Sequence, residues 1–194
     1  ARRLLQQRFG DSGHGFVLAS RGRMFYGHRG IRLRSSKNWR MYSMVRRALG
    51  LDWYGYGGVQ GRARAGAVAH FETDRPSKPV GTRASRFEVF YQKHSKGARL
   101  RLGVDGDVKQ TLVTRASSRE DAFYSLRVPD GPHRFTLGVS GGGQAHVYGV
   151  ALERDEPGVV YDSLGLVGAR VSRLLNSEPA HFASQLAHRS PDLL

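Results

Sequence analysis

Hydrophobic and polar residues alternate with a period of two through the middle of the chain, from residue 58 to residue 154. The alternation is clear in five runs, at 87–91, 100–104, 124–128, 135–139 and 146–152. Turn signals rich in Gly, Asp and Pro separate the runs, at 96–97, 105–107, 129–132 and 141–143. Short strands joined by such turns are typical of an antiparallel β-sandwich. We therefore predict a jelly-roll-like β-sandwich over residues 58–155.

The pattern differs on both sides of this region. Apolar residues at 4, 5 and 9 have helical spacing, and residues 158–175 have the pattern of a strand, a glycine turn and a helix. A second helix is predicted to begin at Ser177-Glu178-Pro179, with an apolar face at 182, 183, 186 and 187, and to end at Ser190-Pro191. We therefore expect the sandwich to be inserted in a partial α/β domain, with flanks at 1–57 and 156–194.

Residues 21–60 show neither period and are rich in Arg, Gly and aromatic residues. We expect an irregular connection here, in which residues 42–51 form a short helix or a strand. Trp53 and Tyr54 are candidate substrate-binding residues, because flat sugar rings and bases both stack on aromatic side chains. The alternative is that these aromatic residues pack against the core.

The triplet Gly10-Asp11-Ser12 matches a sequence that some serine hydrolases use for their nucleophile. In those enzymes the serine follows a buried strand and opens a helix. Here a polar helix precedes Ser12 and the apolar run 16–19 follows it. We therefore predict that Ser12 belongs to a turn and is not a nucleophile.

The charge and the lack of cysteine limit the classes of partner and chemistry that the chain can have. The chain has 31 Lys and Arg against 16 Asp and Glu, a net charge of +15, which favours polyanionic partners. The basic residues are spread along the whole chain and form no dense cluster, so we do not expect nucleic acid as the partner. Cysteine is absent, which excludes disulfides and a thiol nucleophile. We expect no metal, no cofactor and no membrane span, since no ligand spacing, phosphate loop or long apolar run is present.

Two stretches carry a resemblance to a known family. YDSLGLVGAR at 161–170, followed by a helix and PDLL, and RRLLQQRFGDSGHGFVL at 2–18 are similar to segments of SGNH (GDSL-type) hydrolases. The likeness is closest to bacterial peptidoglycan and polysaccharide O-acetylesterases, which carry an inserted carbohydrate-binding-like jelly roll. The resemblance implies that the nucleophile block lies upstream of Ala1 and that this chain is an interior part of the enzyme.

The resemblance also implies one catalytic element, Gly168, whose backbone N–H would join the oxyanion hole, while Gly165 would shape the turn. The chain departs from the family pattern because it shows no strand-borne serine, no Gly-x-Asn block and no Asp-x-x-His pair. We therefore leave open whether the chain is an enzyme, and expect the isolated chain to be inactive.

Our leading hypothesis is an SGNH-type carbohydrate O-acetylesterase or acyltransferase of the bacterial cell envelope, periplasmic or extracellular. Its partners would be a polysaccharide or peptidoglycan substrate and the remainder of the hydrolase domain. The alternative is a non-enzymatic binding module for an anionic glycan. A third hypothesis, less favoured, is nucleic-acid binding through the positive charge.

Overall fold

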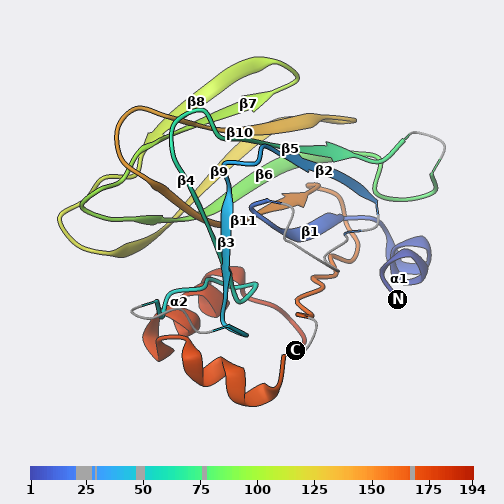
Figure 1. Ribbon diagram of the computed structural model, residues 1–194. Coiled ribbons are helices and arrows are strands. Elements are labelled where there is room, and N and C mark those ends of the chain that lie inside the picture. Colours follow the sequence, from blue (N-terminus) through green and yellow to red (C-terminus); the bar gives the residue numbers. More distant parts are fainter. Residues whose placement is uncertain (21–27, 29, 47–50, 76–77, 167–168) are drawn as a thin grey trace.

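The computed structural model describes residues 1–194 apart from 21–27, 29, 47–50, 76–77 and 167–168. Two antiparallel sheets pack face to face and form a jelly-roll β-sandwich (Figure 1). The predicted sandwich is therefore confirmed. No helix in the described ranges is long and apolar enough to cross a membrane.

The first sheet has the order β3-β4-β11-β6-β9, and β1 also pairs with β11. Its strands are β1 (Gly13–Leu18), β3 (Arg40–Ser43), β4 (Val59–Ala63), β6 (Ala84–Lys93), β9 (Glu120–Gly131) and β11 (Ala145–Glu153). Strands β4 and β1 follow each other along one side of β11, because β4 pairs with 145–147 and β1 with 149–153. Strand β11 is therefore fully buried along its length.

The second sheet has the order β2-β5-β10-β7-β8. Its strands are β2 (Ile31–Ser35), β5 (Val68–Thr73), β7 (Arg99–Val104), β8 (Asp107–Val113) and β10 (Arg134–Ser140). The turn between β7 and β8 has positive φ at Asp105 (55°) and Gly106 (104°). Asp-Gly is the pair that a tight hairpin turn of this kind favours, as the sequence signal predicted.

The main core lies between the two sheets. It is built from alternating apolar side chains, and Phe87 of β6 stacks on Phe135 of β10 with ring centroids 5.0 Å apart. A second apolar cluster covers the outer side of the first sheet, around Phe16, Phe90 and Tyr148. Because both faces of β1 are covered, every residue of the strand is buried, and the apolar residues Phe16, Val17 and Leu18 follow one another without alternation.

In the described ranges the helical elements that flank the sandwich are α1 (Arg2–Phe9), the 3₁₀ helix η1 (Val171–Asn176) and α2 (Pro179–Arg189). Figure 1 shows α2 and η1 together on the outer side of the first sheet. Leu164, Leu166 and Leu186 pack against the second cluster from this side. Helix α1 lies apart from α2 and η1 (Figure 1). Its Gln6 side chain donates hydrogen bonds to the carbonyl oxygens of Gly13 (2.5 Å) and Val159 (3.0 Å).

The prediction of irregular structure over residues 21–60 is wrong for β2, and at β3 the strand that the sequence left open beside a helix is the element that forms. Strand β2 has the alternating sequence Ile-Arg-Leu-Arg-Ser, which is a strand signal of only five residues. Strand β3 replaces the start of the helix considered at 42–51; residues 47–50 of that helix lie outside the described residues. Since β1, β2 and β3 pair within the two sheets, the sandwich begins well before residue 58.

The C-terminal flank also differs from the prediction. The expected strand at 159–161 is reduced to one parallel bridge between Val159 and Asp11. The expected amphipathic helix at 171–175 is the 3₁₀ helix η1, in which Val171 and Leu175 are 85% and 86% exposed. Neither apolar side chain is buried by another part of the described chain, so packing does not stabilise an α-helix here.

Candidate functional site

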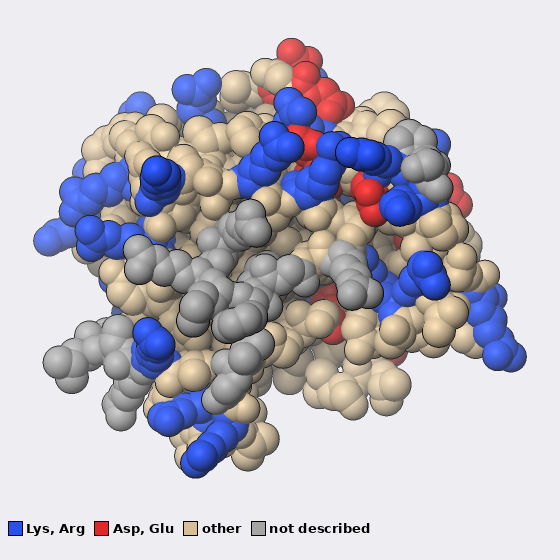
Figure 2. All heavy atoms as spheres, turned by 45° about the vertical axis from the view of Figure 1, so that its right-hand side comes forward, with Lys and Arg blue, Asp and Glu red and all other residues tan. Residues whose placement is uncertain are grey.

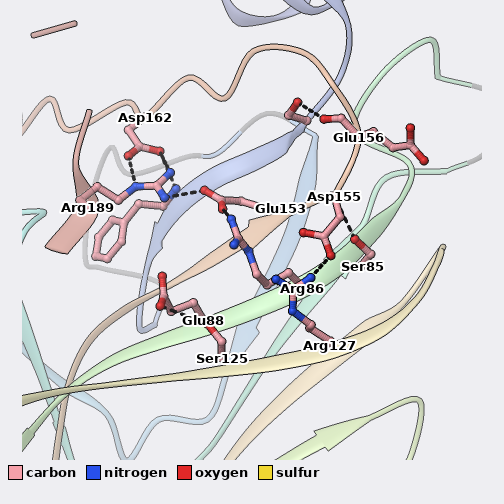
Figure 3. Close-up of polar contacts among 12 residues, drawn as sticks. Ser85, Arg86, Glu88, Ser125, Arg127, Glu153, Asp155, Glu156, Asp162 and Arg189 are labelled. Atoms are coloured by element: carbon pink, nitrogen blue, oxygen red, sulfur yellow. Dashed lines mark hydrogen bonds and ion pairs between the residues drawn. The ribbon is translucent and has the colours of Figure 1, made fainter. Parts of the chain in front are cut away.

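A network of buried charges holds the C-terminal flank on the first sheet (Figure 3). Its centre is Asp162, which lies in the stretch 161–170. Arg189 of α2 donates to this carboxylate from Nε (2.7 Å, to Oδ2) and Nη2 (3.1 Å, to Oδ1). The backbone N–H of Phe16 in β1 donates to Oδ1 as well, at 2.8 Å. One carboxylate therefore joins α2, the flank and the sandwich.

Arg189 extends the network into the first sheet. Its Nη1 lies 2.5 Å from Oε1 of Glu153 at the end of β11, and Arg86 of β6 pairs with the other oxygen of Glu153. Burial alone would lower the pKa of Arg189, but Asp162 and Glu153 raise it above its ordinary value. Arg189 therefore stays charged between its two carboxylates. The same Asp162 carboxylate acts on Tyr56: burial and the nearby negative charge raise the pKa of the Tyr56 hydroxyl to about 12.

Gly15 lets the flank approach β1 closely. Its φ is +77°, and a Cβ atom at this position would collide with the Asp162 carboxylate. A positive φ together with a close contact is a situation that glycine accommodates without strain. Gly15, the second glycine of Gly13-His14-Gly15, is therefore required for the Asp162 contact.

Helix α2 faces the sheet with a polar stripe at every fourth residue. His181 and Gln185 are buried, and Arg189 follows one turn later. The N–H of Gly55 donates to Nε2 of His181 (2.9 Å), and the N–H of Tyr56 donates to Oε1 of Gln185 (3.3 Å). The predicted apolar face is wrong in part, because Ala183 and Ala187 are exposed while Phe182 and Leu186 are half-buried.

His181 is engaged through both ring nitrogens. Because Nε2 accepts from Gly55, the proton lies on Nδ1 and is donated to Asp121 of β9, 2.8 Å away. The Tyr148 hydroxyl donates to the same carboxylate at 3.2 Å. This His–Asp pair resembles a catalytic dyad only in composition, since no ring nitrogen is left to accept a proton from a substrate.

The two predicted substrate-binding residues have different surroundings. Trp53 is half-buried and stacks on His181, with ring centroids 4.5 Å apart, and the Arg119 guanidinium lies 5.0 Å from its ring centre. Tyr54 is fully buried, and its hydroxyl donates to the Leu51 carbonyl at 3.0 Å. Tyr54 therefore packs in the interior, and only Trp53 has surface from which to contact a ligand.

The predicted oxyanion residue, Gly168, lies outside the described residues. Gly165 is exposed, and a Cβ atom there would meet no atom within 4 Å. Ser12 is 8% exposed and its Oγ donates to the Glu156 carbonyl at 2.5 Å. This hydrogen bond ties the segment before β1 to the segment after β11.

Sequence reasoning did not single out Asp162, Arg189 or Glu153. The available signal was the position of each charge beside apolar residues, above all Glu153 at the end of the run 145–152. A charged residue that ends a buried strand needs a partner, but the sequence does not say which one.

A hollow of about 430 Å³ lies at one end of the second sheet. The loops after β5, β7 and β9 meet there, and Glu72 of β5 lines it between Arg32 and Arg134. Charged groups therefore dominate its wall. In the described part of the chain, no cluster of three or more His, Asp or Glu side chains is arranged to bind a metal.

Comparison with known proteins supports the fold assignment. A solved peptidoglycan O-acetylesterase has a TM-score of 0.64 and 18% identity, covering 98% of this chain and 48% of that one. The chain therefore spans about half the length of that esterase. At this identity the likeness shows a shared fold, the jelly-roll β-sandwich together with its flanks.

Carbohydrate-binding modules are also among the similar structures, at lower scores. CsCBM6-3 from Clostridium stercorarium, solved with cellobiose, has a TM-score of 0.42 and 11% identity over 75% of this chain and 97% of that one. A family 35 carbohydrate binding module from Clostridium thermocellum has a TM-score of 0.38 and 9% identity over 64% and 98%. No family model and no curated protein matches the chain.

Proposed function

We propose that this chain is the interior part of an SGNH-type carbohydrate O-acetylesterase or acyltransferase of the bacterial cell envelope, in which the sandwich orients the glycan. The observation that supports this most is the likeness to the peptidoglycan O-acetylesterase over 98% of the chain, including both flanks. The sequence resemblance of residues 2–18 and 161–170 points to the same class independently.

In this proposal Gly168 supplies a backbone N–H to the oxyanion hole. Such a donor stabilises the negative charge that develops on the ester carbonyl oxygen in the transition state. Asp162 lies six residues before Gly168 and is fixed to α2 and β1 by its contacts with Arg189 and Phe16. In this proposal the charge network fixes Asp162, and with it the start of the stretch 161–170, against the first sheet.

The nucleophile and the general base are supplied by other parts of the hydrolase domain. Exposed apolar side chains on the flanks fit this arrangement: Leu4 and Phe9 of α1 are 66% and 56% exposed, and Val171 and Leu175 of η1 more so. Apolar residues exposed on elements that resemble an α/β layer are those that the rest of such a domain would cover.

Trp53 is the proposed glycan contact. Its ring already stacks on His181, and Arg119 lies over it in an exposed ion pair with Asp52. An exposed pair of this kind contributes little stability, so a sugar can displace the guanidinium at small cost.

The test is esterase activity of the full-length protein compared with the isolated chain. We expect the full-length protein to hydrolyse 4-nitrophenyl acetate and to react with a fluorophosphonate probe, and residues 1–194 alone to do neither. In the full-length protein, Gly168→Pro removes the N–H and lowers kcat by about 100-fold or more. The variant Trp53→Ala raises KM for O-acetylated peptidoglycan while kcat changes little.

The matched control is Gly142→Pro, because Gly142 lies in an exposed turn where a Cβ atom meets nothing within 4 Å. Its kcat should equal that of the unmodified protein. A full-length protein without esterase activity, or fluorophosphonate labelling of Ser12 in the isolated chain, would contradict the proposal.

A second candidate function is a non-enzymatic module that binds an anionic glycan. The net charge of +15 favours it, since a positive surface attracts polyanions. The two functions are compatible, because an esterase can hold its polymer through such a surface.

A further inference from the structure

The outer face of the second sheet carries a concentration of arginines. Burial alternates along its strands, so every second side chain points away from the core. The outward positions include Arg32 and Arg34 of β2, Arg99 and Arg101 of β7, and Arg134 of β10. In Figure 1 these strands form the top of the molecule, and α2 and η1 lie on the far side of the first sheet. Figure 2 shows basic side chains gathered along this upper part, with a few acidic ones among them.

Two of the five arginines share a single carboxylate partner. Glu72 lies between Arg32 (2.9 Å) and Arg134 (2.7 Å), and its side chain is only 9% exposed. This row borders the hollow at the end of the sheet. Asp105 and Asp74, which also line the hollow, place further negative charge at that end.

The other three arginines are exposed and have no carboxylate partner in the described part of the chain. Arg99 and Arg101 lie two residues apart on one strand, and Arg34 lies on another strand of the same face. Like charges gathered without counter-charges repel each other and do not stabilise the fold. These three guanidinium groups are therefore available to a ligand.

Between the arginines lie His70, whose Nδ1 is hydrogen-bonded to the Thr136 hydroxyl (3.0 Å), and small or hydroxyl-bearing residues of β10. Arg34 pairs in register with His70, which pairs with Thr136, and Arg101 pairs with Gly138. Ser140 lies opposite Arg99. Three strand intervals separate β2 from β7, about 14 Å at the usual strand spacing. The face therefore offers separated positive charges with hydrogen-bonding groups between them.

We propose that this face binds a carboxylate-bearing polysaccharide, which lies across β2, β5, β10 and β7. The inference rests on the proposed glycan-binding function and names its ligand class. Each of Arg34, Arg99 and Arg101 pairs with a carboxylate, because the planar guanidinium forms two parallel hydrogen bonds with it. Thr136 and Ser140 contact sugar hydroxyls between these charges.

The composition of the face favours a glycan over single-stranded nucleic acid. Proteins that bind single strands stack the bases on aromatic side chains. Among the described residues that point outward from these five strands, none is Phe, Tyr or Trp. The outward side chains of β2, β5, β10 and β7 therefore offer charge and hydrogen-bonding groups, but no Phe, Tyr or Trp ring on which a base could stack.

The test compares polygalacturonate with its fully methyl-esterified form, which has the same sugar backbone without the charges. We expect the chain to bind the acid form more tightly, as measured by affinity electrophoresis and calorimetry. The double variant Arg34→Gln/Arg101→Gln should weaken binding of the acid form about tenfold, since two charge-assisted pairs are lost. Its thermal unfolding midpoint should not fall, because neither arginine has a partner in the fold.

The matched control is Arg170→Gln/Arg173→Gln, which removes the same two charges at and beside η1, on the other side of the molecule. The affinity of this control for polygalacturonate should change less than about twofold, because salt screens charges that lie far from the ligand. Equal weakening in both double variants would mean that net charge drives binding, and would overturn the proposal.

Three further outcomes would also overturn it. If the chain bound duplex DNA as tightly as polygalacturonate, and Arg34→Gln/Arg101→Gln abolished DNA binding, the face would be a nucleic-acid site. If the chain bound polygalacturonate and its methyl ester equally well, and Arg34→Gln/Arg101→Gln bound both as tightly as the unmodified chain, the outer face of the second sheet would not be the binding site. Glycan binding by another part of the chain would still stand. Binding of neither polymer and of no insoluble peptidoglycan would remove glycan binding itself.

Discussion

At the scale of single residues, Asp162 is the side chain that joins the flank both to α2 and to β1. It accepts hydrogen bonds from Arg189 and from the backbone of Phe16, and Gly15 leaves room for it. The Asp162 and Arg189 side chains are 12% and 11% exposed, so water does little to screen or replace the pair. Removing one partner of such a pair leaves the other charge buried without full compensation.

We therefore predict that Asp162→Asn lowers the free energy of unfolding by about 3 kcal/mol, as measured by urea unfolding. Asn keeps the shape but loses the charge that faces Arg189. The control Asp155→Asn breaks the exposed pair with Arg127, whose side chains are 46% and 64% exposed. Its effect should stay below about 1 kcal/mol, and equal effects of the two changes would contradict the argument.

At the scale of elements, α2 is fixed by polar contacts more than by an apolar face. Its start follows local rules, since Glu178 caps the helix by accepting from the N–H groups of Ala180 and His181, and Pro179 occupies the first turn. Its inward face satisfies the backbone N–H groups of Gly55 and Tyr56. The loop that carries Trp53 and the helix therefore hold each other in place.

We predict that His181→Phe loosens this loop. Phe keeps the stacking on Trp53 but leaves the Gly55 N–H without its acceptor, and Asp121 keeps only the Tyr148 hydroxyl of its two buried donors. The expected loss is about 2 to 3 kcal/mol in unfolding free energy, with faster hydrogen exchange at the Gly55 amide.

His188→Phe is the matched control, because His188 is 32% exposed and stacks on Phe123. Its unfolding free energy should change by less than about 1 kcal/mol. Unchanged protection of Gly55 in His181→Phe would show that the histidine does not hold the loop.

At the scale of the whole molecule, two buried histidines link stability to pH. Burial and the charge of Arg2 lower the pKa of His14 to about 4. Burial, with His94 and Arg62 nearby, lowers the pKa of His146 to about 3. Both values lie below the ordinary 6.5, so below pH 6.5 the unfolded chain binds protons that the folded chain does not.

Stability should therefore be complete above pH 6.5 and fall as the pH decreases toward 4. Each histidine contributes a slope of up to about 1.4 kcal/mol per pH unit. Urea unfolding at pH 7, 6 and 5 should show a loss of about 2 kcal/mol between pH 6 and 5, before most carboxylates titrate. The slope should be about half as steep in His146→Gln, and a free energy independent of pH over this range would contradict the assignment.

The sequence was a good guide where local patterns suffice. The five alternating runs became β6, β7, β9, β10 and β11, and the Glu178-Pro179 signal marked the start of α2. It was a poor guide where a strand is short, as in β2, or where apolar residues lack a partner, as in η1. Of the predicted site, Trp53 keeps exposed surface, Tyr54 does not, and Gly168 lies outside the described residues.

The sequence by itself determined the class of the fold, because the period of two assigns side chains to the inside or the outside of a sheet without reference to distant residues. Only the tertiary structure decided which polar residues are buried. Asp162, Arg189 and His181 lie in the flank by sequence, yet their partners are Phe16, Glu153, Gly55 and Asp121, up to 146 positions away. A buried charge is stable only with a matching group in reach, and strand pairing across the whole chain brings these groups together.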